Sequence, residues 1–363
     1  MKIKYLSEEE ALVVLLNHAK ESTKKIRKVL DYFGSAKTLL EESKNLQLAG
    51  LEKWQDQSLW QEDLEAIEKE SIKIISFQSP LFPRSLLQID DPPLLIYCKG
   101  NIEARDQKGV SIVGTRAASF YGLEMAEKIS GELSIQGFSI ISGLARGIDT
   151  KAHLAAIEFG RTLAFIGSGL SHIYPKENEW LVEKICENGA CISEVPMHTK
   201  PKRYLFPKRN RLVSAMGQAS LLIEAPLKSG AMITMELAKK QGKNTFAIPG
   251  RIDVPSFAGN HDLIKNKNAE LIESSVDIVK ALGRSQEDNS AYKEKKDQHF
   301  FLPLNEEEEH LLNLMPVEEI QIEEIAARCE FAIFRLNALL SSLVIKNYIK
   351  EHPGKIFKKS RSV

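Results

Sequence analysis

The chain has 363 residues, of which 43% are hydrophobic, so it is long enough for two or three domains with buried cores. Lysine and arginine total 49 and aspartate and glutamate also total 49, so any affinity for nucleic acid has to come from a local patch. The four cysteines form no CxxC pair and match no zinc spacing, which favours structural thiols in a reducing compartment and no metal. The N-terminal residues MKIKYLSEEE lead directly into charge, and no apolar run is long enough for a membrane span, so we expect a cytoplasmic protein without a membrane segment.

Residues 1–70 predict a small helical accessory domain. Apolar periodicity indicates helices at 8–16, 26–32 and 36–40, with breaks at Gly34 and Gly50. The turn at 33–35 fits a SAM-like or helix-hairpin-helix domain, which can hold a DNA backbone. A plain turn between helices is favoured, because glutamates lie nearby.

The central predicted domain spans residues 71–282. Strands at 72–77 and 94–99 lead into it, separated by a proline-rich loop. Six more strands are predicted near 110–113, 138–142, 162–166, 190–194, 220–224 and 244–248, with helices near 121–135, 150–159, 178–188, 207–217 and 232–241 between them. This alternation predicts an α/β, Rossmann-like parallel sheet core with helices on both faces, whose ligands bind at the carboxyl ends of the strands.

Glycine or serine lies within a few residues of the end of each of these six strands. The first strand stops at Gly114 before a helix, and such a turn, with Arg116 beside it, offers backbone N–H groups, a helix dipole and a guanidinium to a phosphate. The other strand ends add serine–glycine pairs at 142–143 and 229–230. Together they predict a floor of donors for anionic groups, the alternative being that turns simply recruit glycine. No G-x-x-x-x-G-K-[ST] or complete G-x-G-x-x-G motif is present, so we expect neither ATP nor NAD as a cofactor.

The stretch KPKRYLFPKRNR at 200–211 contains six cations, two aromatic residues and no acid. Cations can follow a nucleic-acid backbone while exposed rings stack on unpaired bases, so the stretch predicts a site for single strands without sequence preference. A solvated loop is the alternative. Phe206, Arg209 and Arg211 are the main candidates.

Asp149 and His153 lie four residues apart on a predicted helix, and Glu194 lies at a strand end, so the three could form a catalytic group. A structural role is favoured. Asp149 is placed to cap the helix, and a histidine on a helix packed against a sheet is usually a core residue. We therefore predict no catalytic residue.

Residues 283–300 are polar without an apolar period and predict a linker, and residues 301–363 predict a winged-helix domain. Asn305 is expected to cap a helix that ends at Leu314, helices follow at 322–329 and 332–349, and 351–357 predicts a hairpin. The presumed recognition helix offers only Arg335 and Lys346 as cations, while the first two helices are acidic. Binding to duplex DNA should be weak, and a protein contact or regulation is at least as well supported.

Several of these motifs, in this order, resemble the DNA-processing protein A family, also called DprA or Smf. They are IVGTR, SGLARGIDTKAH, GSGLSHIYPKEN, ISE, FPKRNR, SG and IPG, and the resemblance runs from about residue 81 to about residue 276. It implies a domain that binds single-stranded DNA as a homodimer, protects incoming DNA and loads the RecA recombinase during natural transformation. No enzymatic activity is implied.

The resemblance also implies roles for individual residues. Phosphate binding is implied for Gly114, Thr115, Arg116, Ser142, Gly143, Ser229 and Gly230. Base stacking and backbone contact are implied for Phe206, Arg209, Asn210 and Arg211, beside which Lys202 and Arg203 are further candidates of the basic stretch. The alternative is a phosphoribohydrolase-type enzyme with Glu194 or Glu236 as the catalytic carboxylate, although SGAMITME does not reproduce the PGGxGTxxE signature of those enzymes.

Overall fold

The structure is a computed structural model, and it describes residues 5–18, 23–43, 58–283, 304–346, 348–352 and 354–359. Gly50 and the part of the predicted linker at 284–300 lie outside these residues. The chain divides into two compact units, residues 1–287 and residues 288–363. No helix in the described part of the chain has the length and hydropathy needed to cross a membrane.

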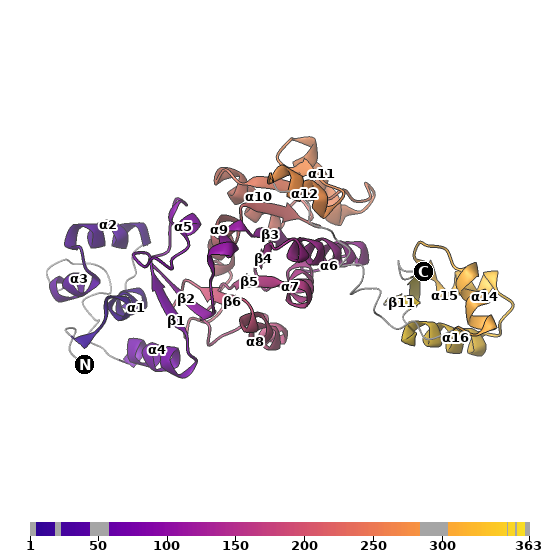
Figure 1. The fold of residues 1–363 in the computed structure, drawn as a ribbon, viewed down its shortest axis with the longest axis horizontal. Coiled ribbons are helices and arrows are strands. Elements are labelled where there is room, and N and C mark those ends of the chain that lie inside the picture. Colours follow the sequence, from indigo (N-terminus) through magenta and orange to yellow (C-terminus); the bar gives the residue numbers. More distant parts are fainter. Residues whose placement is uncertain are drawn as a thin grey trace. The chain divides into compact units, whose positions relative to one another are not determined.

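A sheet of nine strands forms the centre of the first unit (Figure 1). The strands are β1 (Lys73–Ser76), β2 (Leu95–Gly100), β3 (Val110–Val113), β4 (Ser139–Ser142), β5 (Arg161–Phe165), β6 (Ala190–Ser193), β7 (Ala219–Leu222), β8 (Asn244–Ala247) and β9 (Glu270–Leu271). Their order across the sheet is β1-β2-β6-β5-β4-β3-β7-β8-β9. The pairs β1–β2 and β2–β6 are antiparallel, and every other neighbouring pair is parallel. The α/β class predicted from the sequence is confirmed.

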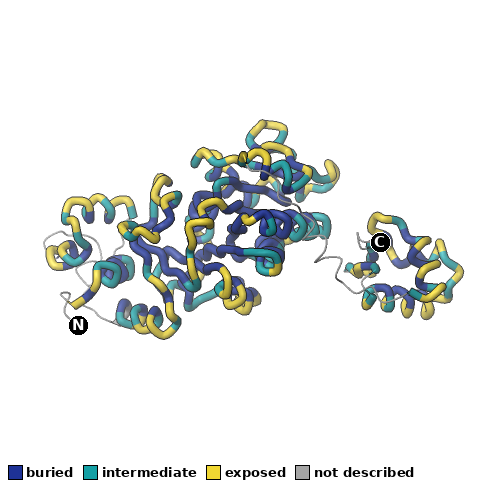
Figure 2. Tube along the Cα trace, in the orientation of Figure 1, coloured by how far each residue is buried: buried dark blue, intermediate teal, exposed yellow. Residues whose placement is uncertain are grey.

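Helices cover both faces of this sheet. The predicted helices are confirmed as α6 (Phe120–Ile135), α7 (Ile148–Phe159), α8 (Glu179–Glu187), α9 (Leu205–Met216) and α10 (Gly230–Lys240), and α5 (Arg84–Leu87), α11 (Ala258–Lys265) and α12 (Ser275–Ala281) are further helices. Along β3, Val110 and Ile112 pack with α6, α7 and α12, whereas Val113 packs with α9 and α10. Because side chains alternate between the faces of a strand, both faces are apolar and the strands are buried (Figure 2).

The order of the strands reverses at β3, which pairs with β4 on one side and with β7 on the other. In open parallel sheets, such a reversal leaves a crevice at the carboxyl ends of the strands, where ligands bind. The segments that follow β3, β4, β5 and β7 are therefore the ones that position a site.

Four helices precede the sheet: α1 (Glu8–His18), α2 (Thr23–Phe33), α3 (Ala36–Glu42) and α4 (Ser58–Lys69). The first three were predicted, and α4 was not. Apolar side chains of α1 and α3 belong to the same buried cluster as Leu94, Leu95 and Tyr97 around β2. These helices therefore share a core with the sheet, and the predicted domain boundary at residue 70 stays a prediction.

The second unit has its own apolar core. It contains α14 (Glu306–Leu314), α15 (Ile322–Arg328) and α16 (Ile333–Ile345), with an antiparallel sheet of β10 (Ile320–Gln321), β12 (Ile356–Lys359) and β11 (Ile349–His352), in that order. Asn305 caps α14 as predicted, since its Oδ1 accepts the N–H of Glu308 at 2.9 Å. The third helix is shorter than predicted, because Lys346 ends it. Three helices and a small antiparallel sheet are the elements that a winged helix requires.

Candidate nucleic-acid interface

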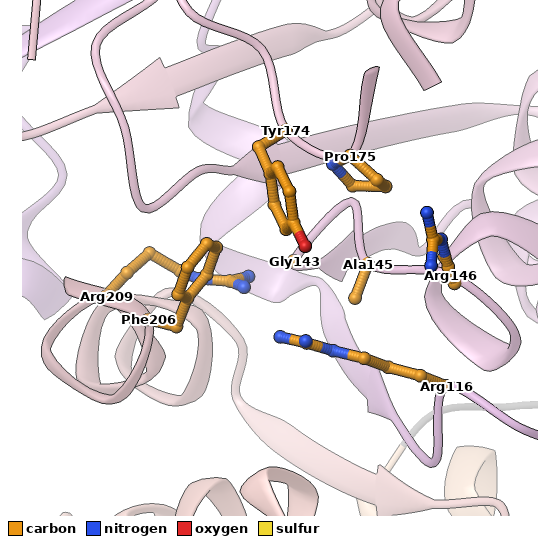
Figure 3. Close-up of a pocket in the computed structure, with 8 residues that line it drawn as sticks. All are labelled: Arg116, Gly143, Ala145, Arg146, Tyr174, Pro175, Phe206 and Arg209. Atoms are coloured by element: carbon orange, nitrogen blue, oxygen red, sulfur yellow. The ribbon is translucent and has the colours of Figure 1, made fainter. Parts of the chain in front are cut away.

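A hollow with about 310 Å³ of empty space lies where the segments after β3, β4 and β5 meet the start of α9 (Figure 3). Its lining residues are Arg116, Gly143, Ala145, Arg146, Tyr174, Pro175, Phe206 and Arg209. Four of these were predicted from the sequence, namely Arg116, Gly143, Phe206 and Arg209. The fold thus brings together residues that are up to 93 positions apart in the chain.

Two aromatic rings and a guanidinium lie close together at this hollow. The ring centroids of Phe206 and Tyr174 are 5.5 Å apart with an interplanar angle of 55°, and Cζ of Arg116 lies 5.5 Å from the centroid of Phe206. Tyr174 is 41% exposed and Phe206 is half-buried. Phe206 also lies outside the apolar core clusters, so its ring is available to a ligand rather than being committed to the core.

Arg209 supplies a second guanidinium, which is almost fully buried. The residue is only 5% exposed, and its Nε has no hydrogen-bond partner in the described part of the chain. Burial lowers the pKa of Arg209 to about 10, with Asp149 raising it and Arg116 lowering it, so the group is charged at neutral pH. A buried cation with an unused donor at a hollow favours binding of an anion or a polar base edge.

Gly143 makes room for this guanidinium. A Cβ atom at position 143 would lie 1.6 Å from Nη1 of Arg209, a separation that no side chain can adopt. The predicted glycine is therefore part of the site. Its role is to let Arg209 approach the backbone.

The backbone donors predicted at the end of β4 are already used by Asp149, which is only 6% exposed. Its Oδ2 accepts the N–H groups of Gly143 at 3.1 Å and Ala145 at 3.2 Å. Ser142 donates its hydroxyl to the carbonyl oxygen of Ile112 at 2.6 Å. These donors have internal partners here, and phosphate binding by Ser142 and Gly143 stays a prediction.

Asp149 and His153 have structural hydrogen bonds. Asp149 lies in the first turn of α7 and Gly147 is at the N-cap, so the predicted capping role of Asp149 is wrong. Burial raises the pKa of Asp149, against the effects of Arg209 and the two backbone donors. Nδ1 of His153 lies 2.7 Å from the hydroxyl of Thr162, and burial lowers the pKa of this fully buried histidine to about 3, so the ring is neutral.

The chain's own Glu224 occupies the start of α6. The buried carboxylate of Glu224 accepts two hydrogen bonds from Ser119, one from the N–H at 2.9 Å and one from the hydroxyl at 2.7 Å. The N–H of Thr115 donates to the backbone oxygen of Glu224 at 2.7 Å. Gly114 is a packing residue, because a Cβ there would lie 2.5 Å from Cγ1 of Ile148. A carboxylate of the chain itself thus lies where the sequence predicted a phosphate, and phosphate binding by Gly114, Thr115 and Arg116 stays a prediction.

Arg211 lies in an ion pair. It is 8% exposed, its Nη2 contacts the carboxylate of Glu194, and Asp91 follows at 3.6 Å. Nε and Nη1 of Arg211 have no hydrogen-bond partner in the described part of the chain, so the prediction that Arg211 contacts DNA stays a prediction. The same pair engages Glu194, one of the two carboxylates of the enzymatic alternative. The other, Glu236, is exposed on α10.

The remaining candidates lie outside the lining of the hollow. Lys202 and Arg203 are exposed in the turn that precedes α9. Asn210 donates its amide to the carbonyl oxygen of Gly230 at 3.2 Å, which links α9 to the start of α10. Ser229 caps α10 by accepting the N–H of Met232 at 3.4 Å, and a Cβ at Gly230 would meet no atom within 4 Å.

Sequence reasoning missed Ala145, Arg146, Tyr174 and Pro175. All four lie in the segments that follow β4 and β5, where the sequence pattern singled out only glycines and serines. Tyr174 lies eight residues beyond the predicted strand 162–166, and its proximity to Phe206 depends on how the long segment after β5 folds back. Arg146 is exposed and forms an ion pair with Glu177.

The fold and the hollow together define an α/β protein with a candidate site, at the carboxyl ends of parallel strands, that combines cations with aromatic rings. Residues 73–283, more than half of the chain, match the family model of DNA recombination-mediator protein A. The chain belongs to this family, as its motifs implied.

Individual relatives agree with this assignment. Protein Smf of Synechocystis is 39% identical over 225 residues, which cover 61% of this chain and 56% of that protein. DNA processing protein DprA of Bacillus subtilis is 36% identical over 221 residues, which cover 60% of this chain and 74% of that protein. The matched region thus spans little more than half the length of the Synechocystis relative.

Two solved structures are similar to the chain. The crystal structure of DprA from Streptococcus pneumoniae has a TM-score of 0.66 and 30% sequence identity, covering 78% of this chain and 99% of that one. The structure of DNA processing protein A from Helicobacter pylori has a TM-score of 0.53 and 29% identity, and the match covers 58% of this chain and 95% of that one. That structure is described as giving insight into the protein's single-stranded DNA binding mode.

Proposed function

We propose that this protein binds single-stranded DNA at the hollow between α9 and the ends of β3, β4 and β5. We further propose that it acts without catalysis, as a homodimer in the cytoplasm, protecting incoming DNA and loading RecA during natural transformation. The observation that carries the proposal is the arrangement of two partly exposed rings, Phe206 and Tyr174, beside the guanidinium groups of Arg116 and Arg209.

Each part of this arrangement suits an unpaired strand. A base has a π-face that can stack on an exposed ring, and guanidinium groups bind phosphate oxygens or the edges of bases. In a duplex, the bases are stacked on each other and their faces are not accessible. The single-stranded DNA binding described for the relative from Helicobacter pylori and the recombination-mediator family support the proposal.

Salt titration of two variants tests the proposed site. Arg116→Ala removes about one ionic contact, so the slope of log affinity against log salt should shrink by roughly 0.7 for a single strand. Phe206→Ala should leave the slope nearly unchanged and cost about 1–3 kcal/mol of binding free energy, the usual value of one base on one ring. Fluorescence anisotropy with a labelled oligonucleotide measures both quantities.

Two results would contradict the proposed site. One is a salt slope that Arg116→Ala leaves unaltered. The other is a Phe206→Ala protein that melts well below the wild type yet binds normally when folded, because the ring would then serve only the fold. Duplex competitor of equal length serves as the control, and we expect single strands to compete better.

RecA loading has its own test. RecA filament formation is followed on single strands that are already covered by a single-strand binding protein, with and without this chain. We expect faster filament formation with the wild type than with Arg116→Ala. Equal rates with and without the wild-type chain would reject the mediator role and leave the DNA-binding proposal intact.

A further inference from the structure

A buried carboxylate joins the N-terminal helices to the loop that leads into the basic stretch. Asp63, on α4, is only 1% exposed. Its Oδ2 accepts the N–H of Met197 at 3.1 Å and the side-chain amide of Asn17 at 2.9 Å, and its Oδ1 accepts the N–H of His198 at 3.3 Å. Two consecutive backbone N–H groups of the loop at 195–199 therefore bind one side chain of a distant helix.

The same loop is held from its other side by the segment that carries Tyr174. Ser171 donates its N–H to the carbonyl oxygen of Met197 at 3.2 Å, and Gly169 donates its N–H to that of Thr199 at 2.9 Å. A Cβ at Gly169 would lie 2.0 Å from the oxygen of Met197, so glycine is required for this approach. The Met197 side chain is fully buried in the core that α1 and α3 share with the sheet.

The loop bound by Asp63 directly precedes the basic stretch that leads to the hollow. Thr199 is followed directly by the basic stretch, which passes through the exposed Lys202 and Arg203 and enters α9 at Leu205, one residue before Phe206. Tyr174 follows the Gly169–Ser171 segment within a few residues. Both rings of the hollow are thus attached to segments that meet at the loop bound by Asp63.

We propose that Asp63 is a positioning residue for the single-strand interface: through Met197 and His198, it makes α1 and α4 part of the scaffold that fixes the basic stretch and the two rings. This inference rests on the proposed function for its consequence in DNA binding. The contact itself is independent of DNA. Burial raises the pKa of Asp63, and the hydrogen bonds from Asn17, Met197 and His198 act in the opposite direction.

Site-resolved proteolysis tests the positioning directly. In Asp63→Asn, one acceptor oxygen becomes an NH₂ group that faces N–H donors, so the loop loses at least one of its bonds. We expect native-state trypsin cleavage after Lys202 and Arg203 to accelerate by roughly tenfold, with other sites unchanged, when fragments are quantified by mass spectrometry.

Two controls separate positioning from general destabilisation. Glu65→Gln makes the same charge change at an exposed position of α4 and should cleave like the wild type. Leu39→Ala opens a cavity in the shared core and leaves the hydrogen bonds of Asp63 to the loop in place. It should raise cleavage in the N-terminal helices without singling out Lys202 and Arg203.

The DNA readout links the contact to the site. In Asp63→Asn, the affinity for a single strand should fall by roughly three- to tenfold, while the salt slope stays at the wild-type value because every cation remains present. Wild-type cleavage of the basic stretch in Asp63→Asn, or a uniform rise at all sites, would overturn the positioning role. If the wild type failed to bind single strands, the proposed function would fall while the proteolysis would still decide the role of Asp63.

Discussion

At the scale of single residues, the hollow depends on a glycine as much as on its cations. Gly143 gives Arg209 a place against the backbone, and Asp149 lies close enough to raise the pKa of that arginine. The carboxylate also binds the backbone N–H groups beside it. Internal hydrogen bonds therefore fix the backbone at the end of β4. The donor group proposed for a ligand is the guanidinium of Arg209.

Gly143→Ala tests this arrangement. The added methyl group occupies the position of Nη1 of Arg209, so the guanidinium has to leave the hollow, and single-strand affinity should fall by roughly tenfold or more. Gly242→Ala is the control, because a Cβ there meets no atom within 4 Å, Gly242 does not line the hollow, and its positive φ of 69° makes alanine costly for stability alone. Anisotropy titrations compare the two, and equal affinities would show that Arg209 has no part in binding.

His153 predicts a pH dependence of stability. Its pKa is lowered to about 3 in the fully buried site, against 6.5 in its ordinary state, so between these values the unfolded chain binds a proton that the folded chain does not. The free energy of unfolding should therefore fall as the pH drops below 6.5, by about 1.4 kcal/mol for each pH unit from this residue.

Urea denaturation of the wild type and His153→Gln measures this contribution. Asp149 and Asp63 have raised pKa values, so they contribute stability that is present at low pH and is lost as the pH rises through their folded-state values. Because both proteins share these groups, the difference between their pH slopes isolates the histidine. Parallel slopes between about pH 7 and about pH 5 would refute the neutral, buried ring.

At the scale of elements, periodicity predicted the central strands and helices well, because buried parallel strands are short apolar runs and each one is followed by an amphipathic helix. The strand ends and the basic stretch, not periodicity, predicted Arg116, Gly143, Phe206 and Arg209, and these four residues line one hollow. Local pattern did not show which donors are already used inside the protein. The partner of Arg211 is 17 residues away, and that of Ser119 is 105 residues away.

The start of α6 shows what such a distant partner does. The helix was expected to receive a phosphate, yet Glu224 supplies the negative charge near its N-terminus and also accepts the hydroxyl of Ser256. A carboxylate at this end of a helix satisfies its free N–H groups and interacts favourably with its dipole. The carboxylate of Glu224 therefore lies at the helix start where the sequence predicted a bound phosphate.

Glu224→Ala should accordingly weaken the fold and spare the site. Loss of the acceptor leaves the Ser119 N–H and two hydroxyl groups unpaired, which should lower the free energy of unfolding by roughly 2–4 kcal/mol. Glu224→Gln, which keeps the shape and one acceptor, should cost less. Thermal melts rank the stabilities of the wild type and the two variants. Single-strand affinity measured well below the melting temperature should stay near the wild-type value, because Glu224 does not line the hollow.

At the scale of the whole molecule, the two units differ in the surface that they offer. The first unit contains the hollow and the exposed basic turn. In the second unit, α14 begins with four glutamates, Arg335 pairs with Glu307, and α16 exposes Ile333, Phe334 and Ile345. Acidic and apolar groups are unsuited to a phosphate backbone, which supports the expectation of a protein contact for this unit.

Truncation after Gly283 tests how the two units share the work. Because each unit has its own core, the first should stay folded without the second. Since the cations and rings of the site belong to the first unit, the shortened chain should keep its single-strand affinity within roughly threefold and its salt slope unchanged. A loss of more than tenfold, with the melting curve of the first unit preserved, would show that the second unit supplies DNA contacts of its own.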